Sequence, residues 1–196
     1  MPAPSSRHRS GKGPRAAEAI FDATLRLLAE RGYAGLTIEA VAQEAGVNKT
    51  TIYRWWPSKA PLLHAALVGA RVLDIDVPDT GTLRADLIAL TEQVIDLVTG
   101  ARTQPVVRAV ASGSGLPDDE LATLTRDFFA DRFSREEPVF TRAVARGELP
   151  PGADPMLLLD LIAGAVWMRA LLRSKPVPPG FAAAVVDAVL PARQSA

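Results

Sequence analysis

The sequence predicts an all-α protein with about nine helices, and three observations support this fold class. Apolar residues recur at helical spacing along most of the chain, as expected for helices with one buried face. Residues typical of helix starts and ends, such as Thr37, Gly46 and Asn48, stand between these apolar segments. No segment has the apolar–polar alternation of a half-buried strand, and the sequence contains no internal repeat.

Residues 37–59 predict two short helices joined by a tight turn. Thr37 is a good N-cap for the first helix, and Gly46 can end it because glycine adopts positive φ without a Cβ clash. Asn48 then caps a second helix over residues 49–55. Two helices with a glycine-containing turn between them form the helix-turn-helix arrangement that many proteins use to bind DNA.

The second helix of this motif presents donors, cations and aromatic rings on its outer face. They are Lys49, Thr50, Thr51, Tyr53, Arg54 and Trp55. Such side chains suit phosphates and the edges of bases. An isolated helix of this kind could instead be a surface helix whose aromatic rings pack at a domain boundary. The capped helices on both sides favour DNA binding.

Residues 15–73 resemble the N-terminal domain of the tetracycline-repressor (TetR) family of bacterial transcription regulators. The matching stretches are Ala16 to Gly32, TIEAVA at 37–42, AGV at 45–47, TIY at 51–53, and Ser58-Lys59 before Leu62-Leu63. The chain departs from the family pattern at two places. Trp55-Trp56 stands where the family usually has a histidine–phenylalanine pair, and Pro61 stands where it usually has an acidic residue.

The motif and the resemblance together assign roles to eight side chains. We expect the bases to be contacted by Lys49, Thr50, Arg54 and Trp55. We expect phosphates to be held by Thr37, Thr51, Tyr53 and, as the resemblance implies, Lys59. The operator should be roughly palindromic double-stranded DNA bound by a homodimer.

Charge and composition agree with this interpretation. Residues 1–60 contain nine Lys and Arg against five Asp and Glu, whereas the rest contains thirteen against seventeen, so a polyanion should bind the N-terminal part. The chain has no cysteine, no secretory signal pattern and no run of 18 uncharged apolar residues. We therefore expect a cytoplasmic protein without a membrane span.

The N-terminal part is expected to contain an arm and four helices. Residues 1–14 predict a disordered basic arm that either solubilises the protein or follows the DNA. Residues 15–74 should form the DNA-binding domain, with its motif at about 37–56. Its first helix should cover residues 15–31 and its fourth should run from Ser58 to about residue 73.

Residues 75–196 should form a helical ligand-binding and dimerisation domain, after a polar break at 74–80. Helices are predicted at 83–98, 103–111, 118–146, 156–172 and 181–190. Pro138 should kink the third of these or start a new helix. The last two helices are apolar nearly all round and need cover on every side.

The all-round apolar character of the last two helices predicts a four-helix dimer interface with a second copy. The interface candidates are Leu158, Ile162, Gly164, Phe181, Val185 and Val189. An apolar cavity for a small apolar or amphipathic effector is the other expectation for this domain. Its candidate residues are His64, Arg108, Phe128, Phe129, Phe133, Arg142, Trp167 and Met168. Each could equally be a core or surface residue.

The sequence offers nothing for catalysis, a cofactor or a metal. It has no P-loop, no nucleophile elbow, no paired carboxylates at a glycine-rich turn and no histidine–acid metal pair. We therefore expect a ligand-responsive transcriptional regulator, most often a repressor in the family it resembles. Two alternatives remain: a constitutive DNA-binding dimer without a ligand, and an α-helical enzyme or ligand carrier.

Overall fold

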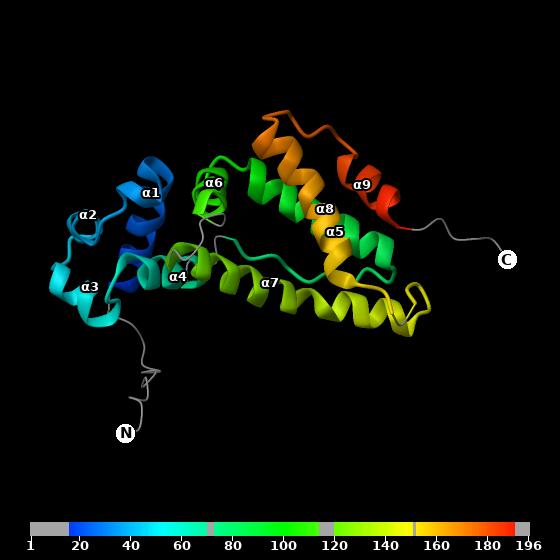
Figure 1. The fold of residues 1–196 in the computed structure, drawn as a ribbon, viewed down its shortest axis with the longest axis horizontal. Coiled ribbons are helices and arrows are strands. Elements are labelled where there is room, and N and C mark those ends of the chain that lie inside the picture. The colour runs from blue at the N-terminus through cyan, green and yellow to red at the C-terminus, as the bar shows by residue number, and fades with distance from the viewer. Residues whose placement is uncertain (1–15, 70–72, 114–119, 151, 191–196) are drawn as a thin grey trace, which may run out of the picture.

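The computed structural model describes residues 16–69, 73–113, 120–150 and 152–190. Within these ranges the chain forms nine α-helices, one π-helical turn and no strand, so the predicted all-α fold is confirmed. The molecule is elongated, with α1 to α4 at one end and α5, α8 and α9 at the other (Figure 1). The basic arm predicted at residues 1–14 lies outside the described residues.

Four helices form the N-terminal end. Their bounds are α1 Ala17–Gly35, α2 Ile38–Glu44, α3 Lys49–Trp55 and α4 Lys59–Gly69. The predicted end of the first helix has a physical counterpart, because Gly32 in α1 has φ 65° and ψ 177° and breaks the regular helix. The chain then makes a last helical turn through Gly35 before it enters α2.

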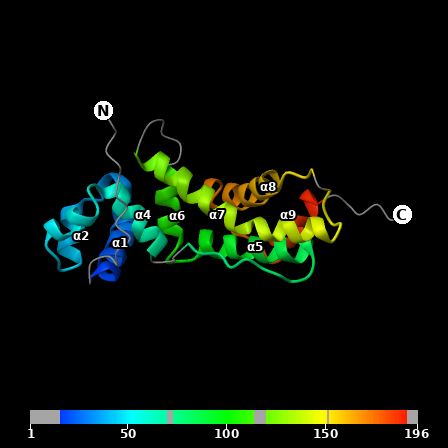
Figure 2. The same cartoon turned by 90° about the horizontal axis from the view of Figure 1, so that it is seen from below.

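The remaining helices form the C-terminal bundle. Their bounds are α5 Leu83–Thr99, α6 Gln104–Gly113, α7 Glu120–Ala145, α8 Pro155–Trp167, the π-helical turn η1 Met168–Leu172, and α9 Phe181–Val189. Helices α5, α7 and α8 pack against one another in pairs, and α9 packs against α5 and α8. Figure 2 shows α7 crossing in front of α5 and α8.

Pro138 does not restart the helix as expected, since α7 continues through it as one helix to Ala145. Pro138 itself is exposed, whereas Val139 and Phe140 directly after it are almost fully buried. Burial of these two side chains against α5 and α8 stabilises the uninterrupted helix. This gain offsets the loss of the backbone hydrogen bond that proline cannot donate.

A hydrophobic core joins the two ends of the molecule. Ile20 and Leu28 of α1 have no exposed surface, and they belong to the same buried cluster as Val107 and Val110 of α6. Helix α1 packs against α2, α4 and α6, so it joins the four N-terminal helices α1 to α4, which we call the head, to the bundle. A second buried cluster lies among α5, α7, α8 and α9.

The segment between α4 and α5 is non-helical over residues 74–80 and is fastened to the bundle by hydrogen bonds. The buried Asp86 carboxylate accepts from the backbone N–H of Thr80 at 2.7 Å and from its hydroxyl at 2.6 Å. The side chain of Gln93 bonds both backbone groups of Asp76, at 2.7 and 3.0 Å. We call residues 73–82 the strap.

Helices α5 and α9 are also joined at the surface. Arg84 donates two hydrogen bonds to the Asp187 carboxylate, at 2.7 and 2.9 Å. This hydrogen bonding, and to a lesser degree the charge of Arg84, holds the pKa of Asp187 below its ordinary value. Because both groups face water, the pair orients α9 more than it stabilises the fold.

Truncation of the core in α1 should destabilise the whole protein. Leu28→Ala removes a fully buried side chain, and we expect the free energy of unfolding to fall by about 2–5 kcal/mol. Val68→Ala, on the exposed side of α4, should change it by less than about 0.5 kcal/mol. Urea denaturation followed by circular dichroism measures both. Equal effects of the two changes would contradict the shared core.

Candidate DNA interface and ligand cavity

The two helices of the predicted motif are capped as their sequence requires. The Thr37 hydroxyl accepts from the backbone N–H of Ala40 at 3.2 Å. The Asn48 side-chain oxygen accepts from the backbone N–H of Thr50 at 3.0 Å and from its hydroxyl at 2.9 Å. Gly46 has φ 65° in the turn between the helices. Local sequence thus determines where α2 and α3 begin and how the chain turns between them.

Two buried side chains fix α3 against the rest of the head. Ile52 is the only residue of α3 that is buried, and Val41 of α2 is likewise without exposed surface. The rest of α3 faces solvent or is half-buried: Lys49, Thr50, Tyr53, Arg54 and Trp55 are exposed, and Thr51 is intermediate. One anchored face leaves the opposite face of α3 free to enter a groove.

Glu39 at the start of α2 contacts two residues of the outward face. The Tyr53 hydroxyl donates to its carboxylate at 3.4 Å, and the Lys49 ammonium lies 3.8 Å from the same oxygen. The carboxylate therefore orients two side chains that we expected to contact DNA.

Lys59 at the start of α4 is held in place by Tyr33. Its ammonium donates to the Tyr33 carbonyl at 2.8 Å and lies 4.2 Å from the centre of the Tyr33 ring. An ammonium has three protons, so this hydrogen bond leaves two for a phosphate oxygen. Lys59 is half-buried at the end of the molecule that carries α3.

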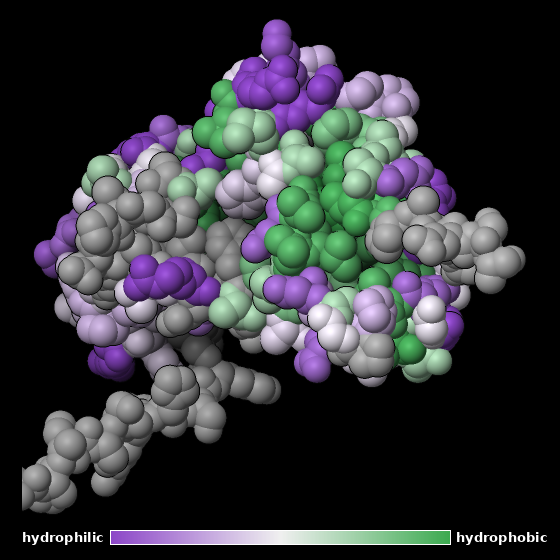
Figure 3. Space-filling model, turned by 45° about the vertical axis from the view of Figure 1, so that its right-hand side comes forward, coloured by the Kyte–Doolittle hydropathy of each residue, from purple (hydrophilic) through white to green (hydrophobic). Residues whose placement is uncertain are grey.

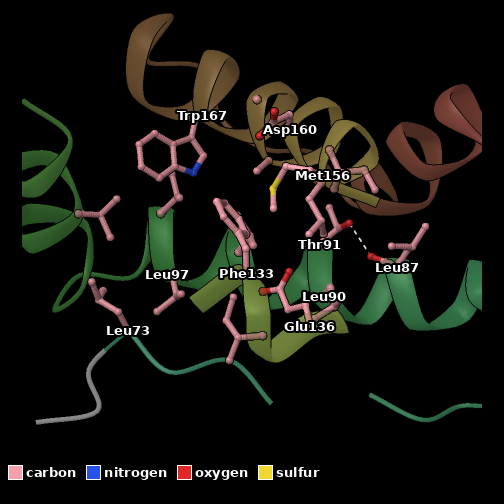
Figure 4. Close-up of a pocket in the computed structure, with 18 of the residues that line it drawn as sticks. Leu73, Leu87, Leu90, Thr91, Leu97, Phe133, Glu136, Met156, Asp160 and Trp167 are labelled. Atoms are coloured by element: carbon pink, nitrogen blue, oxygen red, sulfur yellow. Dashed lines mark hydrogen bonds between the residues drawn. The ribbon is translucent and has the colours of Figure 1, made fainter. Parts of the chain in front are cut away.

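An apolar cavity of 720 Å³ lies in the bundle between α5, α6, α7, α8 and the strap. Helix α5 contributes the largest number of aliphatic side chains, among them Leu87, Leu90 and Leu97. Phe133 of α7 and Trp167 of α8 face each other across the space (Figure 4). The volume lies in the range of natural small-molecule sites.

Among the described residues, the cavity wall contains four polar side chains. They are Thr91, Arg126, Glu136 and Asp160. The Thr91 hydroxyl donates to the Leu87 carbonyl at 2.6 Å (Figure 4). The described residues contain no cluster of three metal-ligating side chains.

Comparison with known proteins identifies the chain. Residues 20–66 match the family model of bacterial regulatory proteins of the tetR family, and residues 77–189 match that of the tetracyclin repressor-like C-terminal domain. The chain belongs to the TetR family.

Individual relatives match the sequence of this chain over nearly its whole length. An uncharacterized HTH-type transcriptional regulator of Mycobacterium bovis is 36% identical over 90% of this chain and 86% of its own length. The DNA-binding transcriptional repressor TetR of Mycobacteroides abscessus is 32% identical over 91% and 94%. The crystal structure of the TetR family transcription regulator SCO0332 superposes with a TM-score of 0.71 and 32% identity, covering 90% of this chain and 97% of that one.

The cavity includes two of the predicted effector residues of this TetR-family chain, Phe133 and Trp167. His64 and Arg108 are exposed outside it, and Met168 is 51% exposed and does not line it. The side chains of Phe128 and Phe129 lie outside the described residues. The structure thus brings together the aromatic pair and none of the predicted cations.

Arg142 has a role that the sequence did not predict. Its guanidinium donates to the Pro78 carbonyl and lies 3.3 Å from the Asp79 carboxylate, so it fastens the strap to α7. Nearby, Arg146 contacts Asp86 at 3.7 Å and Glu148 at 3.2 Å. These cations hold the fold together at the end of α7 and are not directed at the cavity.

The sequence reasoning missed the polar residues of the cavity wall. Glu136 follows Phe133 by three positions, which places both on one side of α7. On α8 the residues Met156, Asp160 and Ala163, with Trp167, line the cavity at spacings of three and four. Extending the helical spacing from the two aromatic residues would have found Glu136 and Asp160.

Helix α8 with its π-helical turn has three apolar faces. One faces the core, with Leu159, Ile162, Val166 and Ala170, of which Leu159 and Ile162 also border the cavity. A second face, with Met156, Asp160, Ala163 and Trp167, lines the cavity. The third faces outward and contains Leu157, Leu161, Met168 and Leu172, which are 54, 48, 51 and 73% exposed. Figure 3 shows the apolar surface on this side of the molecule, near the C-terminal end.

The three apolar faces of α8 and its π-helical turn also explain why this segment has the composition of a membrane-spanning helix. Among the described residues, Pro155–Leu172 is long and apolar enough to cross a bilayer, with a mean hydropathy of 1.7. Length and composition alone give this result, and the segment contains Asp160 and Arg169. The core, the cavity and the outward face account for its apolar residues without a membrane.

The predicted interface residues fall on different faces of α8 and α9. Ile162 and Val185 are buried in the subunit, at 3 and 8% exposure, and so are not available to a second copy. Phe181 is half-buried beneath the Arg169 guanidinium, which lies 5.2 Å from its ring centre. Leu158 and Val189 are half-buried, and Gly164 is exposed at the edge of the cavity, beside the outward residues.

A substitution in the turn between α2 and α3 tests the backbone geometry of the head. No atom lies within 4 Å of a Cβ built on Gly46, so Gly46→Ala acts through its positive φ alone. We expect it to lower the free energy of unfolding by about 1–2 kcal/mol, and Gly46→Asn to cost less because asparagine tolerates this conformation better. Denaturant unfolding compares the stabilities of the two variants. An alanine variant as stable as the asparagine variant would contradict the positive φ of residue 46.

Proposed function

We propose that this TetR-family protein is a cytoplasmic, homodimeric transcriptional repressor that binds a palindromic operator and is released from it by a small molecule. The observation that carries the DNA-binding part is the outward face of α3, where five polar, cationic or aromatic side chains are exposed beside one buried anchor, Ile52. In a dimer, two such helices would enter successive major grooves of one duplex.

The outward face of α8 supports the dimer. Leu157, Leu161 and Leu172 expose large apolar side chains on one stripe. Gly164, which also borders the cavity, is exposed beside them and has no side chain to hold two helices apart. Soluble monomers rarely leave such a surface uncovered. A second copy related by a two-fold axis would cover it with the same stripe.

The cavity supports release by a small molecule and disfavours the constitutive alternative. Its wall includes Leu73 and Ile75 of the strap, which lies between α4 and α5 in the chain, and Val107 and Val110 of α6. Helix α6 packs on α1, and α1 packs on α4. A ligand that moved either wall would therefore shift the head, and a coupling free energy of about 1–3 kcal/mol would lower operator affinity by 5- to 150-fold.

Selection of bound duplexes from a random DNA pool tests the proposed function. The full-length protein should enrich a palindromic sequence, and its affinity for that sequence should fall as salt concentration rises. Recovery of no sequence, together with salt-independent binding, would instead favour the α-helical enzyme or carrier.

Base recognition should depend on Arg54. Arg54→Ala should weaken binding to the selected operator by about 1–3 kcal/mol and relax the preference at particular base pairs. Arg102→Ala removes another exposed guanidinium, in the turn between α5 and α6, and should leave both the affinity and the base preference unchanged. Fluorescence anisotropy with operator and mismatched duplexes gives both quantities. If the Arg54 variant kept its base preference, the assignment of base recognition to α3 would be wrong.

The dimer should depend on the outward stripe of α8. Leu161→Asp buries a charge in the proposed interface, so we expect a folded monomer that binds the operator poorly. Val144→Asp places the same charge on α7, where the side chain is 38% exposed, and should leave the dimer intact. Sedimentation velocity at micromolar concentration distinguishes the two. A monomeric unmodified protein would contradict the dimer outright.

A further inference from the structure

An acid, Glu39 of α2, contacts the outward face of α3. One oxygen of its carboxylate accepts from the Tyr53 hydroxyl at 3.4 Å and lies 3.8 Å from the Lys49 ammonium. Lys49 and Tyr53 are four residues apart on α3, so they lie on one side of that helix. The Glu39 charge therefore stands beside the surface to which a duplex would bring a high density of negative charge.

The position of Glu39 matters more for binding than for folding. The side chains of Lys49 and Glu39 are 57 and 56% exposed, and an ion pair that faces water stabilises a fold very little. The other acid of residues 37–59 is Glu44 at the end of α2, and its carboxylate pairs with the Arg26 guanidinium of α1 at 2.7 Å. In this fully described motif, Glu39 is thus the acid that contacts α3.

The contact with Glu39 uses donors that a phosphate would need. A phenol hydroxyl has one proton, so Tyr53 in this geometry presents lone pairs to its surroundings, and these repel a phosphate oxygen. The phosphate contact that we expect of Tyr53 therefore requires Glu39 to release it. Lys49 has three protons, so it can keep Glu39 as a partner and still donate to the edge of a guanine.

The cost of the Glu39 charge differs between two kinds of duplex. At an arbitrary sequence the phosphates hold the protein, so Glu39 meets like charge and Lys49 leaves it to reach a phosphate. In the operator, Lys49 lies over base edges with Glu39 beside it. The amino groups of cytosine and adenine in the major groove are further donors for a carboxylate. The Glu39 charge is compensated there and costs less.

We infer that Glu39 is a specificity-determining residue, which weakens binding to arbitrary duplexes more than binding to the operator. This inference rests on the proposed function, in which α3 enters a major groove. A charge that is left unpaired only with the wrong partner is a general source of specificity. Glu39 also directs Lys49 toward the bases, and in that respect it is a positioning residue.

Glu39→Gln tests the inference, because glutamine keeps the size of the side chain and removes its charge. By fluorescence anisotropy, the full-length variant should bind a mixed-sequence duplex about three- to tenfold more tightly and the selected operator less than about twofold more tightly. Its affinity for the mixed-sequence duplex should also depend more steeply on salt, since Lys49 is free to bind a phosphate. Glu44→Gln removes the same charge from the same helix and should leave the ratio of the two affinities unchanged.

The role of Lys49 is tested by a double-mutant cycle. In a Lys49→Ala background, Glu39→Gln should tighten mixed-sequence binding by a smaller factor than in the unmodified protein. Equal factors in the two backgrounds would contradict the positioning role.

Three results would overturn the inference and leave the proposed function intact. They are an unchanged affinity ratio in the Glu39→Gln variant, an equal fall of the ratio in the Glu44→Gln variant, and weaker operator binding with unaltered mixed-sequence binding. The last result would make Glu39 an ordinary base contact. Failure to select any operator with the unmodified protein is a different outcome, which removes the proposed function itself.

Discussion

Helix α1 packs against α4 on one side and α6 on another. The position of the head relative to the cavity depends on these two contacts. Its buried residues, including Ile20 and Leu28, share one hydrophobic cluster with Val107 and Val110 of the cavity wall. Packed interiors move between discrete arrangements because they contain little free volume. Helix α6 therefore shares one packed interior with the helices that hold α3.

Phe21 of α1 connects the end of α3 to the end of α4. Phe21 of α1 meets Trp56 edge-on, with ring centres 5.5 Å apart, and Trp56 stands where the family usually has phenylalanine. On its other side Phe21 approaches Gly69 so closely that an added Cβ would lie 2.4 Å from the ring. The absence of a side chain at Gly69 makes room for the ring that supports the larger Trp56.

A cavity of this size costs stability, since the side chains around it lack packing partners on one side. Polar contacts around the strap offset part of that cost. Asp86, Arg142 and Arg146 connect the strap and α5 to the end of α7, away from the cavity itself. The bundle is thus held by polar contacts at the end of α7.

Local signals in the sequence determined the helices and the motif, because caps and breakers such as Thr37, Gly46 and Asn48 act within a few residues of themselves. The same signals placed the exposed face of α3 through its single buried residue, Ile52. Tertiary structure alone decided that Pro138 continues α7 and that Arg142 binds the strap. It also decided which residues of α8 face the core, the cavity or the outside. When a helix is apolar on every side, its sequence does not show which face will be buried. The helices that pack against it therefore determine where each side chain lies.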